Sequence, residues 1–302
     1  MRQSHPVNGW LVLDKHSGLT SAQAVGRIRK LYRARKAGHA GTLDPAATGL
    51  LAIALGEATK TIPHVMDGTK AYRFALMMGQ ATDTDDAEGS VLATSTTRPE
   101  TVELDAALDS FQGTILQRPP NVSAIRVGGR RAHDLTRSGI APGLANRPVR
   151  IHRLTLLARP DPDRAEFEMV CGKGTYVRSL ARDLGETLGC LGHATDIRRT
   201  RSDPFSLTDA VSLDTLETVD DQRRTAWLRG PEAALVGLPQ VNCLPDAVAR
   251  LRNGVPVEVQ EPDATAVSGT VAWASFNGEA VATGIIRDGR FHPRRVLAPT
   301  SG

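Results

Sequence analysis

The sequence has little cysteine, no long apolar run and no signal-peptide pattern. Its three cysteines, Cys171, Cys190 and Cys243, are too few for a disulfide scaffold, and no two of them have the spacing of metal ligands. The longest apolar run, residues 50–55, is far shorter than the ~20 residues that span a bilayer. Residues 1–10 lack the charged and then apolar pattern of a signal peptide. We therefore expect a cytoplasmic protein without a membrane segment, a metal cluster or a disulfide framework.

The composition is that of a globular protein. The chain has 302 residues, 40% of them hydrophobic before glycine is counted, which is too apolar for general disorder and long enough for one large domain or two. Apolar patterns predict strands at residues 10–15, 71–80, 151–158 and 166–171, and helices from Thr20 to the glycines at 38–41, over 99–113 and over 179–188. Strands and helices alternate without a repeating βαβ period, which favours a mixed α+β fold. Gly-Pro and Leu-Pro pairs within 230–239 indicate a domain boundary, and the short apolar runs beyond it are typical of a small all-β module.

Positive charge is concentrated in two segments. The formal net charge is only +4, with 37 lysines and arginines against 33 acids. Residues 118–153 contain eight arginines and one acid, a net charge of +7, and residues 27–36 contain six cations on a predicted helix, which leaves −9 on the rest of the chain. Because arginine binds phosphates through a planar fork and stacks on bases, these segments predict a surface for a polyanion. RNA is favoured over a membrane because no apolar face accompanies the arginines. The alternative is a solvated basic surface without a specific role.

One segment, residues 38–51, combines glycines, a carboxylate and a proline directly before an apolar run. The glycines allow close approach of a backbone or a ligand, and Pro45 disfavours helical geometry at Asp44, so the carboxylate lies on an extended or turn segment next to the core. A carboxylate held in this way can serve as a nucleophile or a base. From the residues alone, a structural Asp-Pro turn or an N-cap is the simpler interpretation, and the catalytic one is the alternative.

The same segment and several others resemble one known family. Residues 39–51 and 55–60 resemble the G-H-x-G-x-L-D-P-x-A-x-G-x-L…G-x-A-T-K signature of the TruB-type tRNA pseudouridine-55 synthases. Further segments resemble other motifs of the family in the same order along the chain. Residues 13–21 resemble D-K-P-x-G-x-T-S, and residues 70–73 resemble K-x-Y. Residues 79–89 resemble G-x-x-T-D-T-x-D-x-x-G, and residues 172–180 resemble K-G-T-Y-I-R-S-L. The resemblance covers roughly residues 8–210.

The resemblance implies a fold and a division into domains. It implies an α+β catalytic domain with a mixed, mainly antiparallel sheet over residues 1–236, in which residues 118–153 form an RNA-clamping insertion. It also implies a small β-rich PUA-like domain over residues 237–302, although the match there is loose. Within the insertion, Val122 and His133 stand where the family has tyrosines, which puts particular stacking contacts in doubt.

The resemblance also implies roles for individual residues. Asp44 matches the family's catalytic aspartate, Tyr72 the tyrosine that stacks on the flipped base, and Arg178 the arginine that pairs with the catalytic aspartate. Lys15 is expected to contact phosphate or to support the active-site loop. His39 is expected to occupy the space that the extruded nucleotide leaves, or to replace its stacking contacts. The alternative is a histidine that only forms hydrogen bonds within its loop. The other residues implied in substrate binding are Tyr176 and Leu180 at the pocket walls and Arg126, Arg130 and Arg131 in the insertion.

These implications predict a stand-alone enzyme that isomerises uridine 55 in the T-loop of tRNA to pseudouridine by base flipping. The reaction needs no redox or group donor, and we expect no cofactor and no metal. We expect tRNA, bound through its T-arm, no obligatory protein partner, and a monomer. Two alternatives are a catalytically idle tRNA-binding or tRNA-folding factor and the related guide-RNA-dependent synthase, which works with partner proteins. The presence of Asp44, Tyr72 and Arg178 argues against the first, and the long insertion argues against the second.

Overall fold

A computed structural model describes residues 7–259 and 268–298. The expectation that no signal peptide is present concerns residues 1–10 and so lies partly outside the described residues. The chain divides into two compact units. The first unit comprises residues 1–45, 49–67 and 202–302, and the second comprises residues 46–48 and 68–201.

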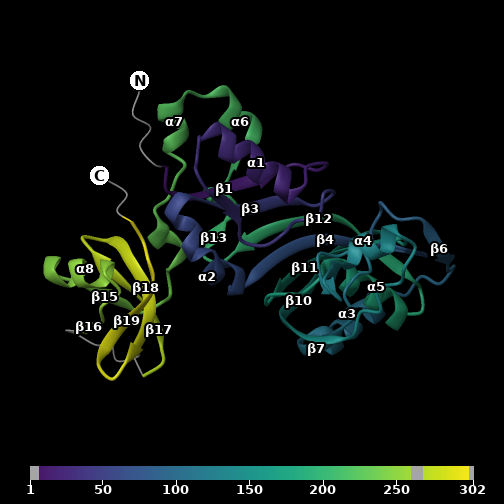
Figure 1. The fold of residues 1–302 in the computed structure, drawn as a ribbon. Coiled ribbons are helices and arrows are strands. Elements are labelled where there is room, and N and C mark those ends of the chain that lie inside the picture. The colour runs from purple at the N-terminus through teal and green to yellow at the C-terminus, as the bar shows by residue number, and fades with distance from the viewer. Residues whose placement is uncertain (1–6, 260–267, 299–302) are drawn as a thin grey trace. The chain divides into compact units, whose positions relative to one another are not determined.

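The first unit begins with two strands that are buried along almost their whole length. Its elements before residue 235 are β1 (Gly9–Lys15), α1 (Ser21–Leu31), β2 (Ala37–His39), β3 (Thr48–Leu55), η1 (Gly56–Thr61), α2 (Ile62–Asp67), β13 (Phe205–Ser206), η3 (Leu207–Asp209), β14 (Val211–Ser212), α6 (Leu213–Thr218), α7 (Asp221–Thr225) and η4 (Pro231–Ala234). β1 pairs antiparallel with β3 (Figure 1). β1 also pairs parallel with β14, and β2 pairs antiparallel with the other side of β3. The nearly continuous apolar sequences of β1 and β3 suit this burial, which leaves few positions for polar side chains.

Helix α1 begins as predicted and ends earlier than predicted. Thr20 caps it, since the Thr20 hydroxyl accepts from Gln23 N and the Gln23 side chain accepts from Thr20 N. The helix ends at Leu31, and Arg33 adopts a left-handed backbone with φ of 53°. The prediction that the helix runs to the glycines at 38–41 is therefore wrong, and the six cations of residues 27–36 lie on a helix and on the turn that follows it.

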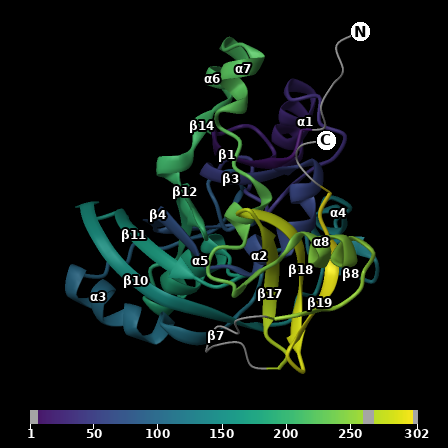
Figure 2. The same ribbon diagram turned by 90° about the vertical axis from the view of Figure 1, so that its left-hand side faces the viewer.

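A second sheet in the first unit is formed by residues near the C-terminus. Its elements are β15 (Gln240–Asn242), α8 (Pro245–Arg252), β16 (Val257–Glu258), β17 (Val271–Phe276), β18 (Glu279–Arg287) and β19 (Arg290–Val296), with the strand order β15-β17-β18-β19-β16. Figure 2 shows β17, β18 and β19 side by side. The predicted β-rich module is confirmed, but it is not all-β. Helix α8 forms because Pro245 suits the first helical position and because Val248 and Leu251, three residues apart, pack on the sheet.

The second unit is built on a sheet with the strand order β12-β4-β11-β10-β7, in which β4, β11, β10 and β7 pair antiparallel. Its elements are β4 (Lys70–Met78), β5 (Gln80–Thr82), β6 (Val91–Thr94), α3 (Thr101–Leu108), η2 (Asp109–Phe111), β7 (Gly113–Gln117), β8 (Arg126–Val127), β9 (Arg130–Arg131), α4 (Ala132–Arg137), β10 (Arg147–Asp161), β11 (Arg164–Cys171), α5 (Val177–Thr187) and β12 (Gly192–Ser202). Strands β10 and β11 are neighbours in both views (Figures 1 and 2). The predicted mixed, mainly antiparallel α+β fold and the pairing of the two predicted strands at 151–158 and 166–171 are confirmed.

The core of the second unit lies between this sheet and the helices α3 and α5. Along β11, buried and partly exposed side chains alternate, so that Phe167 and Met169 point into the core. Leu180 and Leu184 of α5 are fully buried in the same cluster. This packing holds the N-terminal half of α5 in place. Three residues that the sequence analysis singled out, Tyr176, Arg178 and Leu180, lie in or next to this part of the helix.

Candidate active site

Asp44 lies in the loop between β2 and β3, and the residue before it is fixed by α1. Leu43 is 3% exposed, and its backbone N–H donates to the Ser21 hydroxyl at 2.8 Å, while that hydroxyl donates to the Leu43 carbonyl at 2.9 Å. Ser21 is itself buried at the start of α1. The backbone next to Asp44 is therefore held by a buried side chain that uses both its donor and an acceptor position.

The residue after Asp44 is fixed as well, by the turn that follows β1. The carbonyl of Pro45 accepts from Gly18 N at 2.9 Å and from Lys15 Nζ at 3.0 Å. Lys15 is only 1% exposed, and its Nζ also donates to the His16 carbonyl at 2.9 Å. Of the two roles that the sequence left open for Lys15, these contacts favour support of the loop over contact with phosphate.

His39 and Tyr72 lie on strands of different units. His39 ends β2, opposite Ile53 of β3, and is partly buried. Tyr72 is on β4, opposite Met169 of β11, and is also partly buried, with its side chain packed against the core of the second unit. The stacking roles that the resemblance implies for both rings stay predictions.

Leu180 is 0% exposed and belongs to the core of the second unit. Burial of its apolar side chain stabilises the packing of α5 on the sheet. The place at a pocket wall that the resemblance implies for Leu180 stays a prediction.

Tyr176 stands directly before α5 and is held on both its backbone and its ring. Its N–H donates to Gln117 Oε1 at 2.8 Å, and its carbonyl accepts from Gln117 Nε2 at 3.1 Å. The guanidinium of Arg147 lies 5.2 Å from the centre of the Tyr176 ring, which is within the range of a cation–π contact. Arg147 is in turn fixed, since its Nη2 donates to the carbonyl of Gly174 at 2.7 Å. This ring is thus oriented before any ligand binds.

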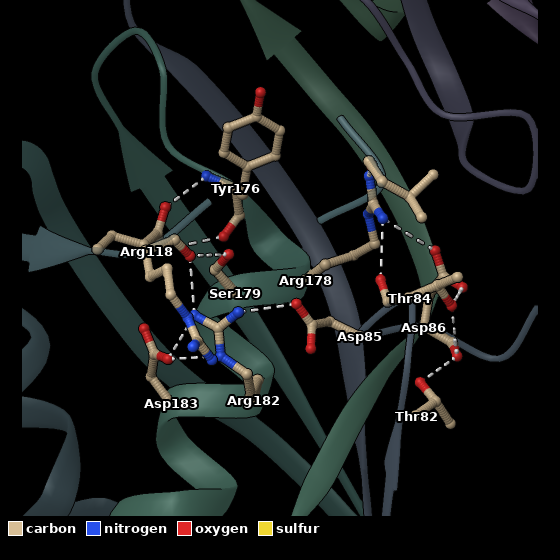
Figure 3. A network of polar contacts seen from close by, with 12 residues as sticks. Thr82, Thr84, Asp85, Asp86, Arg118, Tyr176, Arg178, Ser179, Arg182 and Asp183 are labelled. Carbon is tan, nitrogen blue, oxygen red and sulfur yellow. Dashed lines mark hydrogen bonds and ion pairs between the residues drawn. The ribbon is translucent and has the colours of Figure 1, made fainter. Parts of the chain in front are cut away.

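Arg178 is buried at the N-terminal end of α5, with its guanidinium among backbone carbonyls and a carboxylate (Figure 3). Its Nη1 donates to the Thr84 carbonyl at 2.9 Å and lies 3.5 Å from Asp86 Oδ2, and its Nη2 donates to the Val122 carbonyl at 3.0 Å. Because the guanidinium is planar and rigid, three contacts in different directions leave it one orientation. Thr84 and Val122 are far away in sequence, so this orientation depends on the tertiary fold.

These contacts also clarify the two departures from the family pattern. Val122 meets Arg178 through its backbone carbonyl, a contact that any residue at position 122 can make. His133 donates from Nδ1 to the Ser123 carbonyl at 3.0 Å, so it fixes the start of the insertion. Neither contact requires the tyrosine that the family has at the two positions.

The loop between β5 and β6, residues 83–90, is rich in carboxylates and is called the acidic loop below. It contains functional candidates that the sequence analysis did not assign. Asp86 accepts from the Thr84 hydroxyl at 2.6 Å and from Glu88 N at 3.0 Å, while its second oxygen faces Arg178. Burial raises the pKa of the neighbouring Asp85, and the guanidinium groups of Arg182, Arg178 and Arg118 act against that rise. The sequence contains these acids within the T-D-T-x-D motif, which could have marked them as candidates. It does not show which arginine each acid contacts.

The arginines predicted to contact RNA lie on a short hairpin in the insertion. Gly128 and Gly129 have φ of 56° and 81°, as a two-residue hairpin turn requires, and they join β8 to β9. Arg126, Arg130 and Arg131 are all exposed, and Arg126 pairs directly opposite Arg131. Like charges opposite each other in a hairpin are unfavourable, and an anion between them removes that cost.

Two negative findings apply to the described ranges 7–259 and 268–298. Within them, no group of three or more His, Cys, Asp or Glu side chains is arranged to hold a metal ion. No helix in those ranges is both long enough and apolar enough to cross a bilayer.

Family models match most of the chain. The model of the TruB family pseudouridylate synthase N-terminal domain matches residues 29–177, and that of the tRNA pseudouridylate synthase B C-terminal domain matches residues 178–235. The chain belongs to the TruB family. The matched regions include Asp44, Tyr72 and Arg178, so the three residues proposed for catalysis lie in the part of the chain that defines the family.

Individual TruB relatives are similar over almost the whole chain. It is 53% identical over 297 residues to tRNA pseudouridine synthase B of Dinoroseobacter shibae, a match that covers 98% of this chain and 97% of that protein. It is 49% identical over 298 residues to tRNA pseudouridine synthase B of Ruegeria pomeroyi, with 98% of each chain covered. Among solved structures, a crystal structure of a Cbf5–Nop10–Gar1 complex matches with a TM-score of 0.74 and 24% identity, covering 97% of this chain and 85% of that one. This last similarity supports the fold.

Proposed function

We propose that this protein is a tRNA pseudouridine synthase that isomerises uridine 55 in the T-loop of tRNA. The observation that carries the proposal is the identity of about half of all residues, over nearly the full length of both chains, with relatives named tRNA pseudouridine synthase B. The position of the uridine comes from the motif resemblance described above.

The reaction rearranges bonds without a net change in oxidation state. The N1–C1′ bond breaks, the uracil turns, and a C5–C1′ bond forms; a proton leaves C5 and N1 gains one. One carboxylate is sufficient for this chemistry, and we assign it to Asp44. Asp44 can attack C1′, attack C6 or remove a proton at C2′. The two backbone attachments that hold Leu43 and Pro45 support any of these roles, because a nucleophile or a base gains from a fixed position.

Tyr72 and Arg178 would serve the extruded base and the carboxylate. Taking a base out of its stack costs about a few kcal/mol, and stacking on the Tyr72 ring would recover part of that cost. The Tyr72 phenol can also assist the loss of the proton from C5. Arg178 would keep Asp44 ionised and oriented, because a nearby cation favours the charged form of a carboxyl. Its three-point attachment within its own unit supports such a positioning role.

The remaining assignments concern binding and context. Arg126, Arg130 and Arg131 would bind phosphates of the T-arm, with His39 and Tyr176 close to the extruded nucleotide and Lys15 holding the loop. We propose a catalytic domain over residues 1–236 and a PUA-like domain over 237–302, acting as a monomer in the cytoplasm without an obligatory protein partner. The free thiols of the three cysteines fit a reducing compartment.

The test is to incubate the purified protein, without guide RNA or other proteins, with unmodified tRNA and to locate pseudouridine. We expect it at position 55 with the wild type and none with Asp44→Asn. That variant removes the charge and the nucleophile but keeps the size of the side chain, so its Kd for tRNA should stay within about twofold of wild type.

Each contrary result has a distinct meaning. Wild-type turnover by Asp44→Asn contradicts the assignment of the carboxylate. Tight tRNA binding without product in the wild type indicates an idle factor, and product that forms only after a guide RNA is added indicates a guide-dependent enzyme.

A further inference from the structure

Helix α5 carries a second buried arginine one turn after Arg178. Arg182 is 7% exposed and Arg178 is 4% exposed, and residues four apart lie on the same face of a helix. Arg182 lies beyond the residues 172–180 that resemble the family's K-G-T-Y-I-R-S-L motif. Burying two guanidinium groups side by side is costly unless each has its own partners.

The acidic loop supplies one carboxylate for each of the two arginines. Asp85 Oδ2 accepts from Arg182 Nη1 at 2.8 Å, and Asp86 Oδ2 lies 3.5 Å from Arg178 Nη1. Two consecutive residues can meet two different guanidinium groups because Asp85 has a left-handed backbone, with φ of 61°. Figure 3 shows Asp85 directed toward Arg182, while Asp86 lies beside Thr84. The backbone strain at Asp85 is thus coupled to a specific pairing.

Arg182 is also attached to the first residue of the insertion, Arg118. Its Nη2 donates to the Arg118 carbonyl at 2.8 Å, and that same carbonyl accepts from the Ser179 hydroxyl at 2.7 Å. Its Nε and Nη2 donate to Asp183 Oδ1 at 2.9 and 2.7 Å. One buried side chain therefore joins the acidic loop, helix α5 and the end of β7.

The acidic loop is what holds Arg178 on one side. The Thr84 carbonyl and the Asp86 carboxylate both contact Arg178, and Asp85 lies between these two residues in the chain. A shift of Asp85 away from Arg182 would move both contacts together. The loop is also attached to β12, since the Asp85 carbonyl accepts from Ala194 N at 3.0 Å and Asp86 forms an isolated β-bridge with Ala194. The ion pair adds a side-chain attachment between the loop and α5 that does not involve Arg178 itself.

We propose that Asp85 and Arg182 form a positioning pair for Arg178: their ion pair fixes the loop whose neighbouring groups orient the Arg178 guanidinium. The proposal rests on the proposed function, in which Arg178 serves the isomerisation. Neither residue needs to contact the tRNA, so the pair acts on the rate of the chemical step and not on binding.

The experiment compares Asp85→Asn, Arg182→Gln and the double variant with wild type. It measures the single-turnover rate of pseudouridine formation at saturating tRNA, the Kd for tRNA and the thermal midpoint. We expect each single variant to react about tenfold more slowly, the magnitude typical of removing supporting hydrogen bonds, with the Kd within about twofold of wild type. The double variant should be no slower than the slower single variant, because the two side chains act as one unit.

Asp183→Asn is the matched control. Asp183 also accepts two hydrogen bonds from Arg182, but it lies on α5 and not on the acidic loop. We expect it to react at close to the wild-type rate. Arg182→Lys keeps the cation opposite Asp85 and should recover part of the rate that Arg182→Gln loses.

Several outcomes overturn the proposal. These are a wild-type rate for Asp85→Asn, an equal loss for Asp183→Asn, a loss that arises from a weaker Kd, or additive losses in the double variant. If Asp85→Asn and Arg182→Lys both unfold, the pair serves stability and the proposal is also overturned. Absence of product from the wild type contradicts the proposed function instead, so the two failures are distinguishable.

Discussion

The arginines of α5 and the arginines of the β8–β9 hairpin have the same charge and opposite surroundings. Arg178 and Arg182 are almost completely buried and contact carboxylates and backbone carbonyls of distant segments. Arg126 and Arg131 are exposed and lie opposite each other on the hairpin. A buried guanidinium has its orientation set by protein partners, whereas an exposed one keeps its donors for a ligand. On this difference rest our proposals that the first pair serves geometry and that the second serves binding.

The strongest test of this comparison is Arg178→Lys. Lysine keeps the positive charge near Asp86 but cannot replace three contacts in fixed directions. We expect the single-turnover rate to fall by about 10²–10³-fold, the typical cost of removing one well-placed polar group from an active site, with little change in the Kd for tRNA. Arg164→Lys is the control, because that arginine lies outside the network and pairs with Glu166 and Asp196. A proportional weakening of tRNA binding by Arg178→Lys would assign Arg178 to the binding surface instead.

The converse test neutralises the hairpin with Arg126→Gln, Arg130→Gln and Arg131→Gln together. We expect weaker tRNA binding and a flatter dependence of log Kd on log salt, by about 0.7–0.9 for each phosphate that the hairpin no longer neutralises. The rate at saturating tRNA should stay at the wild-type value. Binding titrations at several salt concentrations measure the slope, with Arg164→Gln as the control for removal of a paired arginine. An unchanged slope would show that the hairpin does not bind phosphates.

The smallest effect that we expect concerns Glu57, a partly buried carboxylate whose ion-pair partner, Lys60, is also partly buried. It extends the comparison of buried and exposed charges from arginines to a carboxylate. Glu57 accepts from Lys60 Nζ at 2.6 Å and from Ala298 N at 2.8 Å, and Lys60 Nζ donates to the Val296 carbonyl at 2.7 Å. Burial raises the pKa of Glu57, but these hydrogen bonds and the charges of Lys60 and Lys36 outweigh it, so the pKa lies below its ordinary value. Ionised Glu57 therefore stabilises the fold above the ordinary pKa, and this stabilisation is lost as the pH falls through the lowered one.

We expect Glu57→Gln to lower the thermal midpoint by about 1–3 °C at pH 7, since ion pairs that stay partly exposed to water contribute little. The difference from wild type should shrink as the pH falls below the ordinary glutamate pKa, and it should disappear once the pH is below the lowered pKa, where the Glu57 carboxyl is protonated in the folded chain as well. Melting curves recorded from pH 7 down to the acid limit of the fold check this. A difference that persists at low pH would mean that the substitution acts through packing and not through charge.

Local signals predicted much of the fold. Thr20 is a capping residue with Gln23 three positions later, and the structure has a capping box there. The alternating apolar residues of 166–171 form most of β11. Prediction failed where a local pattern met a tertiary requirement: the helix through the cations of 27–36 stops at Leu31, and helix α8 forms inside a module predicted to be all-β.

The candidate site was predicted in part. The motifs singled out Asp44, Tyr72 and Arg178, and the roles that they imply stay predictions. They assigned no role to Asp86, Asp85 or Arg182. An acid and an arginine separated by more than ninety residues leave no periodic pattern, so their pairing can be seen only after the chain has folded.

The sequence by itself determined the family, the residue types available for catalysis and the concentration of arginine within 118–153. These properties depend on identity and spacing along the chain. The tertiary structure decided which arginines are buried, which carboxylate each one meets and how the backbone on both sides of Asp44 is held. The physical reason is that the cost of burying a charge is offset by partners from distant segments, and the fold determines which segments those are.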